Sequence, residues 1–227
     1  MDTGELKHAK EEGMPQVERI YHRYGKWYMR IDDKCRGVEL PEDIARKMHE
    51  SLVMTSQFAK ARYRDAYFDS LYSRQCHGTV LFALGLATKE DLDRAHHTFD
   101  MGIIPQNELR NYTNETDLVA HMRATLGNKL GYGYQQIGSM RLSGRNVRAG
   151  SHSFIVGVDE LGRVICYDKF AVESAGVNEL SNFWKYEEAR AGTWACVPIE
   201  KILGDEKLRA RIQKELRASY DLPPRAS

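Results

Sequence analysis

Two features that mark other classes of protein are missing from this chain of 227 residues. No stretch approaches the roughly 18 consecutive apolar residues that a membrane-spanning helix needs. There is also no excess of one charge, since 33 Lys and Arg face 32 Asp and Glu, for a formal net charge of +1. Dedicated nucleic-acid-binding proteins carry a marked basic excess. We therefore expect neither a membrane span nor a nucleic-acid partner.

Cysteine is also scarce. The four cysteines are too few for a disulfide scaffold in a chain of this length, and none forms the Cys-x-x-Cys pair typical of structural zinc sites. We therefore expect no cofactor and no metal. The first residues are polar and lack the apolar segment of a signal peptide, so we expect folding in a reducing cytoplasm.

Apolar residues make up 42% of the chain, which is ordinary for a globular protein, and their pattern changes along the sequence. Residues 1–16 predict a flexible arm, and residues 17–220 predict one domain. Helix-forming residues predominate over 17–133, and β-branched and aromatic residues alternate with turn residues over 134–200. A last helix is predicted over 200–219. Helices followed by an antiparallel sheet indicate an α+β fold.

Three residues lie at positions on these predicted elements that are typical of a thiol active site. Cys76 begins an apolar run that predicts a helix over 76–86. His152 begins one strand-like run and Asp168 ends the next, with a turn signal at 159–162 between them. Strands joined by a short turn run antiparallel, so we expect the first and last residues of this hairpin to lie roughly opposite each other.

A nucleophile, a base and an orienting carboxylate are the groups that covalent acyl chemistry needs. A helix N-terminus and a neighbouring imidazolium both favour the thiolate form of a cysteine. In this interpretation His152 deprotonates Cys76, and Asp168 holds the imidazole in the productive tautomer. The alternative is that Cys76 is a core residue, because free cysteine behaves as a small hydrophobic residue.

Several neighbours are weaker candidates for support. Gln75 directly precedes the cysteine and could donate to an oxyanion beside the backbone N–H of Cys76. Phe170 follows the aspartate by two residues and could shield the His–Asp pair from water. Adjacent helical residues do not share a face, so we expect His77 to play a structural role. A basic loop before His152 could bind an acidic partner or a phosphate through Arg141, Arg145 and Arg148.

This pattern resembles the papain-like cysteine peptidases, and most closely their compact bacterial effector and toxin branch of the YopT type. The similarity rests on Cys76 in "RQCHGTVLFALG", His152 in "GSHSFIVGVDELGRV" and Asp168 in "ICYDKF", and it spans roughly residues 70–200. One departure is Ser70, which stands six residues before the cysteine, where papain has its oxyanion glutamine.

The resemblance implies a papain-like fold, in which a nucleophile helix packs on an antiparallel sheet. It implies a cysteine protease that acts on a protein substrate, such as a host protein. It also implies a virulence factor that is made in the cytoplasm and secreted into a host cell without a cleavable signal peptide.

Other functions remain open from the sequence. Glutamine deamidation uses the same triad with ammonia as the leaving group, and acyl transfer uses it with an amine as the acceptor. A non-catalytic interaction protein is the alternative from another class. In that case the aromatic-rich N-terminal region and the amphipathic C-terminal helix would be the partner surfaces.

Overall fold

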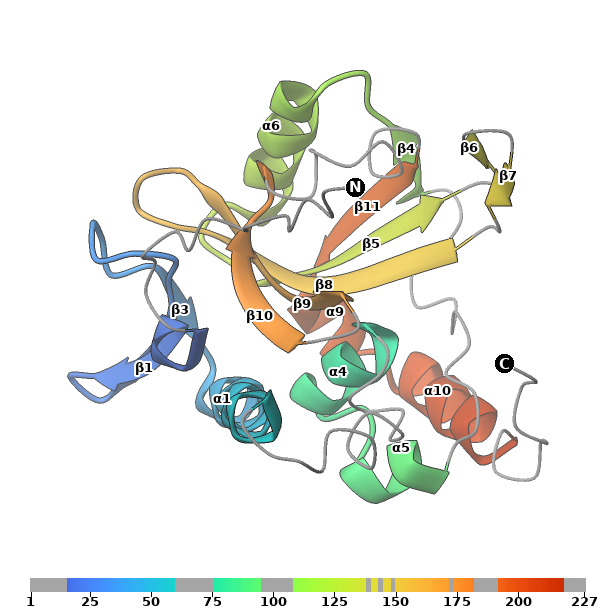
Figure 1. Cartoon of the computed structure of the whole chain (residues 1–227), viewed down its shortest axis with the longest axis horizontal. Coiled ribbons are helices and arrows are strands. Elements are labelled where there is room, and N and C mark those ends of the chain that lie inside the picture. Colours follow the sequence, from blue (N-terminus) through green and yellow to red (C-terminus); the bar gives the residue numbers. More distant parts are fainter. Residues whose placement is uncertain are drawn as a thin grey trace, which may run out of the picture.

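The computed structural model describes residues 16–59, 76–94, 108–137, 140–142, 145–147, 150–171, 174–181 and 192–218. These residues form helices and antiparallel sheets, as an α+β fold requires (Figure 1). The predicted arm over 1–16 lies outside the described residues except for Gln16. Among the described residues, none of the helices has the length and apolar character that crossing a bilayer would take.

A six-stranded antiparallel sheet forms the centre of the structure. Its strand order is β10-β9-β8-β5-β11-β4. The strands are β4 (Arg110–Asn111), β5 (Gly131–Ile137), β8 (Gly150–Val158), β9 (Val164–Ala171), β10 (Ser174–Glu179) and β11 (Thr193–Pro198). A separate two-stranded hairpin joins β6 (Met140–Leu142) to β7 (Arg145–Val147).

A smaller sheet precedes the large one in the chain. After a short 3-10 helix, η1 (Gln16–Arg19), it consists of β1 (Ile20–Arg23), β2 (Lys26–Met29) and β3 (Val38–Leu40) in that order. Helix α1 (Glu42–Ala59) follows directly. Pro41 stands just before the helix, and Glu42 and Asp43 lie in its first turn, where acidic side chains favour the positive end of the helix dipole.

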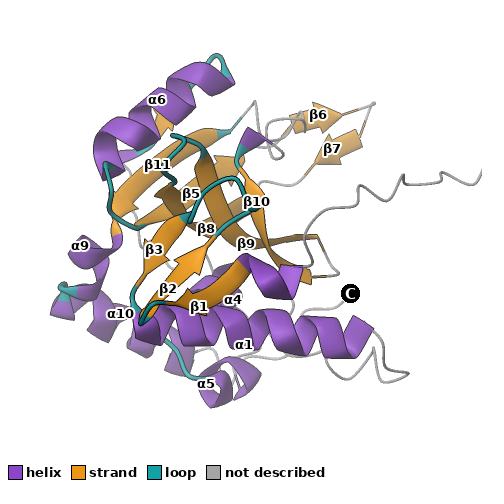
Figure 2. Ribbon diagram, turned by 90° about the vertical axis from the view of Figure 1, so that its left-hand side faces the viewer, coloured by secondary structure: helices purple, strands orange, loops and turns teal. Residues whose placement is uncertain are grey.

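Helices cover both faces of the large sheet. The described helices that follow α1 in the chain are α4 (Cys76–Ala83), α5 (Lys89–Arg94), α6 (Glu115–Leu126), α9 (Ile199–Leu203) and α10 (Glu206–Ala218). Helix α6 lies on the side of the large sheet away from α1 and α4 (Figure 2). Successive side chains of β8 point to opposite faces of the sheet, so this strand contributes to the cores on both faces. Ile155 joins the core that contains residues of α1, α4, α9 and α10, whereas Phe154 and Val156 join the core beneath α6.

Helix α4 is shorter than the predicted 76–86. It ends at Ala83, and Gly85 follows with a φ of +68°, a left-handed conformation that glycine adopts readily. The apolar run continues through Leu84 and Leu86, which are buried although they lie beyond the helix. The apolar pattern therefore continues past the end of the helix, because the apolar residues after the helix are also buried.

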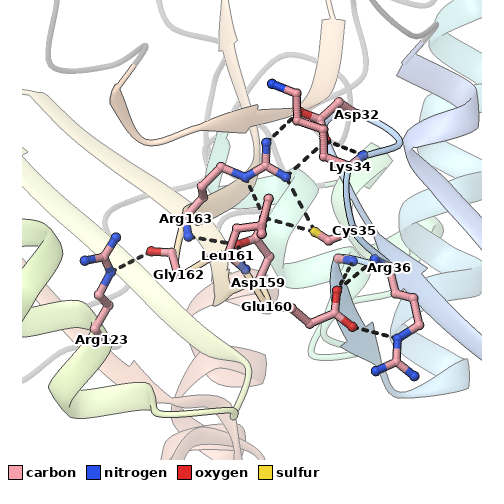
Figure 3. A network of polar contacts seen from close by, with 11 residues as sticks. Asp32, Lys34, Cys35, Arg36, Arg123, Asp159, Glu160, Leu161, Gly162 and Arg163 are labelled. Atoms are coloured by element: carbon pink, nitrogen blue, oxygen red, sulfur yellow. Dashed lines mark hydrogen bonds and ion pairs between the residues drawn. The ribbon is translucent and has the colours of Figure 1, made fainter.

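The turn between β8 and β9 is held by a network of charged groups (Figure 3). Arg163 donates to Asp159 at 2.7 Å and, through two nitrogens, to Asp32 in the loop between β2 and β3 at 2.6 and 3.1 Å. Asp159 also accepts the backbone N–H groups of Leu161 and Arg163 at 3.0 and 2.8 Å. The network joins the small sheet to the hairpin that carries His152 and Asp168.

Replacing Arg163 with Met should destabilise the fold by roughly 2–3 kcal/mol, because the buried carboxylate of Asp159 would lose its charged partner. The methionine retains most of the apolar stem. The matched control is Arg36→Met, which breaks a more exposed pair with Glu160 and should cost less than about 1 kcal/mol. Urea unfolding of both variants measures the difference, and equal small losses would contradict this role for Arg163.

Candidate active site

The N-terminus of α4 lies where two strands of the sheet stop pairing. Helix α4 packs against β8 and β9. The pairing of β8 with β9 starts at the turn between them and ends where Ile155 stands opposite Tyr167. The pairing of β8 with β5 continues further, as far as Gly150. The first part of β8 is therefore paired on its β5 side but not with β9. Cys76, the first residue of α4, lies close to this part of β8.

His152 and Asp168 both lie beyond the last paired position of β8 and β9. If the register continued by one step, Phe154 and not His152 would stand opposite Asp168. The hairpin's first and last residues therefore lie roughly opposite each other, as expected, but with an offset of two positions. The two side chains still share a face, because side chains two positions apart along a strand point the same way, and a diagonal pair is within reach of a long side chain.

The diagonal pair makes a short contact. Nε2 of His152 lies 2.6 Å from Oδ2 of Asp168. Both side chains are buried, with 7% of His152 and 1% of Asp168 exposed. The imidazole also stacks on Phe154, with 5.9 Å between the ring centroids. Burial raises the pKa of Asp168, while its interactions with His152 and then Asn178 lower it.

Cys76 is a free, half-buried thiol, and its Sγ lies 3.8 Å from the backbone oxygen of Ser151. Burial alone would lower the pKa of His152, but Cys76 and then Asp168 act against it and raise that pKa to about 10. Because Nε2 already contacts Asp168, Nδ1 is the ring nitrogen left for the thiol. The three residues predicted from the sequence thus lie together, with the imidazole between the sulfur and the carboxylate.

The weaker candidates are only partly described. Gln75 and Arg148 lie outside the described residues. Phe170 belongs to β9, Arg141 to β6 and Arg145 to β7, but only the backbone of these three is described. Their contribution to the site therefore stays a prediction.

No pattern in the sequence singles out Gln135. It lies directly opposite His152 in the β5–β8 ladder, so its side chain shares the face of the imidazole, and it is buried. A Cβ atom at Gly192 would come within 2.8 Å of its Nε2, so its amide is closely packed. A glutamine that follows the two tyrosines of β5 carries no pattern that distinguishes it from a surface residue.

Among the described residues, no group of three or more His, Cys, Asp or Glu side chains gathers as metal ligands would. No family model, curated protein or solved structure matches the chain. The chemistry of the site is therefore inferred from its geometry.

Replacing Cys76 with Ala should lower the pKa of His152, because the interactions of Cys76 with the imidazole act to raise that pKa. In the unaltered protein the imidazole should stay protonated well above its ordinary pKa of about 6.5 and lose its proton near pH 10. Nuclear magnetic resonance of the labelled imidazole measures both values. Cys196→Ala, which removes a buried thiol on β11, is the control and should leave the titration unchanged. Titration near pH 6.5 in all three proteins would contradict the pairing.

Proposed function

We propose that this chain is a papain-like thiol hydrolase that cleaves a protein substrate through Cys76, His152 and Asp168. The observation that carries the proposal is the placement of one buried imidazole between a helix-terminal thiol and a buried carboxylate. A core cysteine would not require a histidine with a raised pKa beside it. Neither would it require an aspartate 2.6 Å from the far nitrogen of that histidine.

In the first half-reaction the Cys76 thiolate attacks the carbonyl carbon of the scissile amide and forms a C–S bond. The first N–H groups of a helix have no partner within the helix, so those at the start of α4 are suited to stabilise the oxyanion. The His152 imidazolium then gives its proton to the leaving nitrogen as the C–N bond breaks. The product is a thioester on Cys76 and a free amine.

In the second half-reaction His152 acts as a base. It takes a proton from water, whose oxygen attacks the thioester carbon, and the C–S bond breaks to release the acid and restore the thiolate. Asp168 remains ionised and bound to Nε2. It keeps Nδ1 directed at the sulfur and stabilises the charged imidazole during both steps.

The papain-like arrangement is part of this proposal. It is supported by a helix that bears the nucleophile and packs against an antiparallel sheet, whose neighbouring strands supply the base and the carboxylate. The YopT-type assignment extends it to a bacterial virulence factor that is secreted into a host cell and cleaves a host protein. That extension rests on the similarity of the segments around Cys76, His152 and Asp168.

Iodoacetamide should label Cys76 faster than Cys35 by about tenfold or more at pH 6, because only Cys76 lies beside a protonated imidazole. Cys35 is a suitable internal control: it is also half-buried, but burial raises the pKa of its thiol. Cys166 and Cys196 are buried and should stay unlabelled in the folded protein. Peptide mapping reports each site.

In the same experiment on His152→Ala, iodoacetamide should label Cys76 no faster than Cys35. Asp168→Asn should reduce the difference in labelling rate between the two cysteines, since the imidazole loses its charged partner. If Cys76 in the folded, unaltered protein reacts no faster than Cys35 at pH 6, the proposed thiol chemistry is wrong.

The reaction products distinguish peptide-bond cleavage from deamidation, acyl transfer and simple partner binding. Mixing the protein with a cell lysate, beside Cys76→Ala, should yield new protein N-termini only with the unaltered chain. Mass spectrometry of the same samples detects glutamine converted to glutamate, and that product alone would assign the site to deamidation. An amide formed between a glutamine and an added amine would instead indicate acyl transfer. Partner binding that is equal for both proteins, with none of these products, would favour an interaction protein.

A further inference from the structure

The apolar contacts of α4 fix its position along its own axis less sharply than a directional contact would. All residues from Gly78 to Ala83 are buried, and apolar burial has no direction. A shift of the helix by one residue moves its N-terminus by about 1.5 Å. A displacement of that size would separate the sulfur of Cys76 from the imidazole of His152. The proposed chemistry therefore requires a directional contact near the start of the helix.

His77 makes such contacts. Its Nδ1 lies 2.5 Å from the hydroxyl oxygen of Ser153, and its Nε2 lies 2.9 Å from that of Ser151. The Ser153 hydroxyl also lies 2.6 Å from the hydroxyl of Tyr132 on β5. Ser153 and Tyr132 are each only 1% exposed. Both ring nitrogens of His77 therefore contact serine hydroxyls, and the Nδ1 contact belongs to a network with the buried side chains of Ser153 and Tyr132.

The two serines flank the proposed base. Alternation along β8 directs Ser151 and Ser153 toward His77, while His152 between them lies on the opposite face of the strand. Its imidazole meets the sulfur of Cys76 past the edge of β8 that does not pair with β9. The sulfur of Cys76 lies 3.8 Å from the backbone oxygen of Ser151. Neighbouring residues of α4 thus contact three consecutive residues of β8. A rigid strand segment connects the groups that bind His77 to the imidazole that faces the sulfur.

We propose that His77 is a positioning residue, which binds Ser151 and Ser153 and so fixes the distance between Cys76 and His152. This inference rests on the proposed function, because it concerns the geometry of the same site. His77 takes no proton in the reaction, since both of its nitrogens already contact serine hydroxyls. Its contacts select one position of α4 among those that apolar packing alone would allow.

The test compares variants that lose polar contacts of His77 with a control variant that loses a polar contact on α1. His77→Phe keeps a ring but removes both contacts, and His77→Asn restores one donor or acceptor near the position of Nδ1. Ser153→Ala removes one contact while leaving His77 in place. The matched control is Ser51→Ala on α1, which loses a hydrogen bond from a similarly buried hydroxyl to the backbone oxygen of Lys47.

Each variant is measured for thermal unfolding, for the rate of Cys76 alkylation between about pH 5 and 8, and for the titration of His152. His77→Phe should slow alkylation at pH 6 by about tenfold to a hundredfold, because small displacements of reacting groups are costly. It should also move the titration of His152 to lower pH. Ser153→Ala and His77→Asn should show smaller changes of the same kind, and Ser51→Ala should change only the unfolding temperature.

A purely structural role predicts a different result. In that case His77→Phe and Ser153→Ala would unfold at lower temperature, as Ser51→Ala does, but keep the unaltered pH profile of alkylation and the His152 titration. That result would overturn the inference. If His77→Phe does not fold, the pH profile of alkylation and the His152 titration of Ser153→Ala decide between the two roles. Failure of the unaltered protein to show selective labelling of Cys76 would instead refute the proposed function.

Discussion

The site depends on the place where β8 and β9 cease to pair. Their ladder ends at Ile155 and Tyr167, while β8 continues along β5 to Gly150. If the two strands paired to their ends, their hydrogen bonds would occupy the backbone edge near which the thiol of Cys76 lies. The incomplete ladder leaves that edge of β8 free of β9. The same divergence allows His152 and Asp168 to meet diagonally across the strands.

Two ionisable side chains of the site, His152 and Asp168, are buried, and Cys76 lies half-buried beside them. Burial disfavours the charged forms of His152 and Asp168, raising the pKa of Asp168 and acting to lower that of His152. The contacts among these three residues oppose burial at His152, whose pKa rises to about 10. Removing Asp168 or His152 takes a charged partner from a buried group, which is costly. The Arg163 network at the turn and the His77 network at the helix start hold the two elements that bring these residues together.

Some of this could be predicted from the sequence, because local chemistry decides it. The turn at 159–162 has an aspartate that accepts backbone N–H groups and a glycine with a φ of +76°, and both residues are recognisable in the sequence. The start of α4 at Cys76 follows from the apolar run. The α+β class follows from the change of pattern along the chain.

Other features depend on contacts between residues far apart in the sequence. The two-position offset of His152 and Asp168 results from where the ladder ends, which no local pattern encodes. Ser153 and Tyr132 meet only because β5 and β8 are neighbours in the sheet. A structural role for His77 is expected from its position next to Cys76, but its two serine partners are visible only once α4 is packed on β8.

The most direct measurement is the ultraviolet absorbance of the thiolate in the folded protein at about pH 6, as a difference between the unaltered chain and Cys76→Ala. A thiolate–imidazolium pair predicts a difference at this pH that disappears in His152→Ala. If the two proteins have the same absorbance at pH 6 and differ only in alkaline solution, Cys76 is an ordinary thiol. The imidazole beside it would then have no catalytic partner.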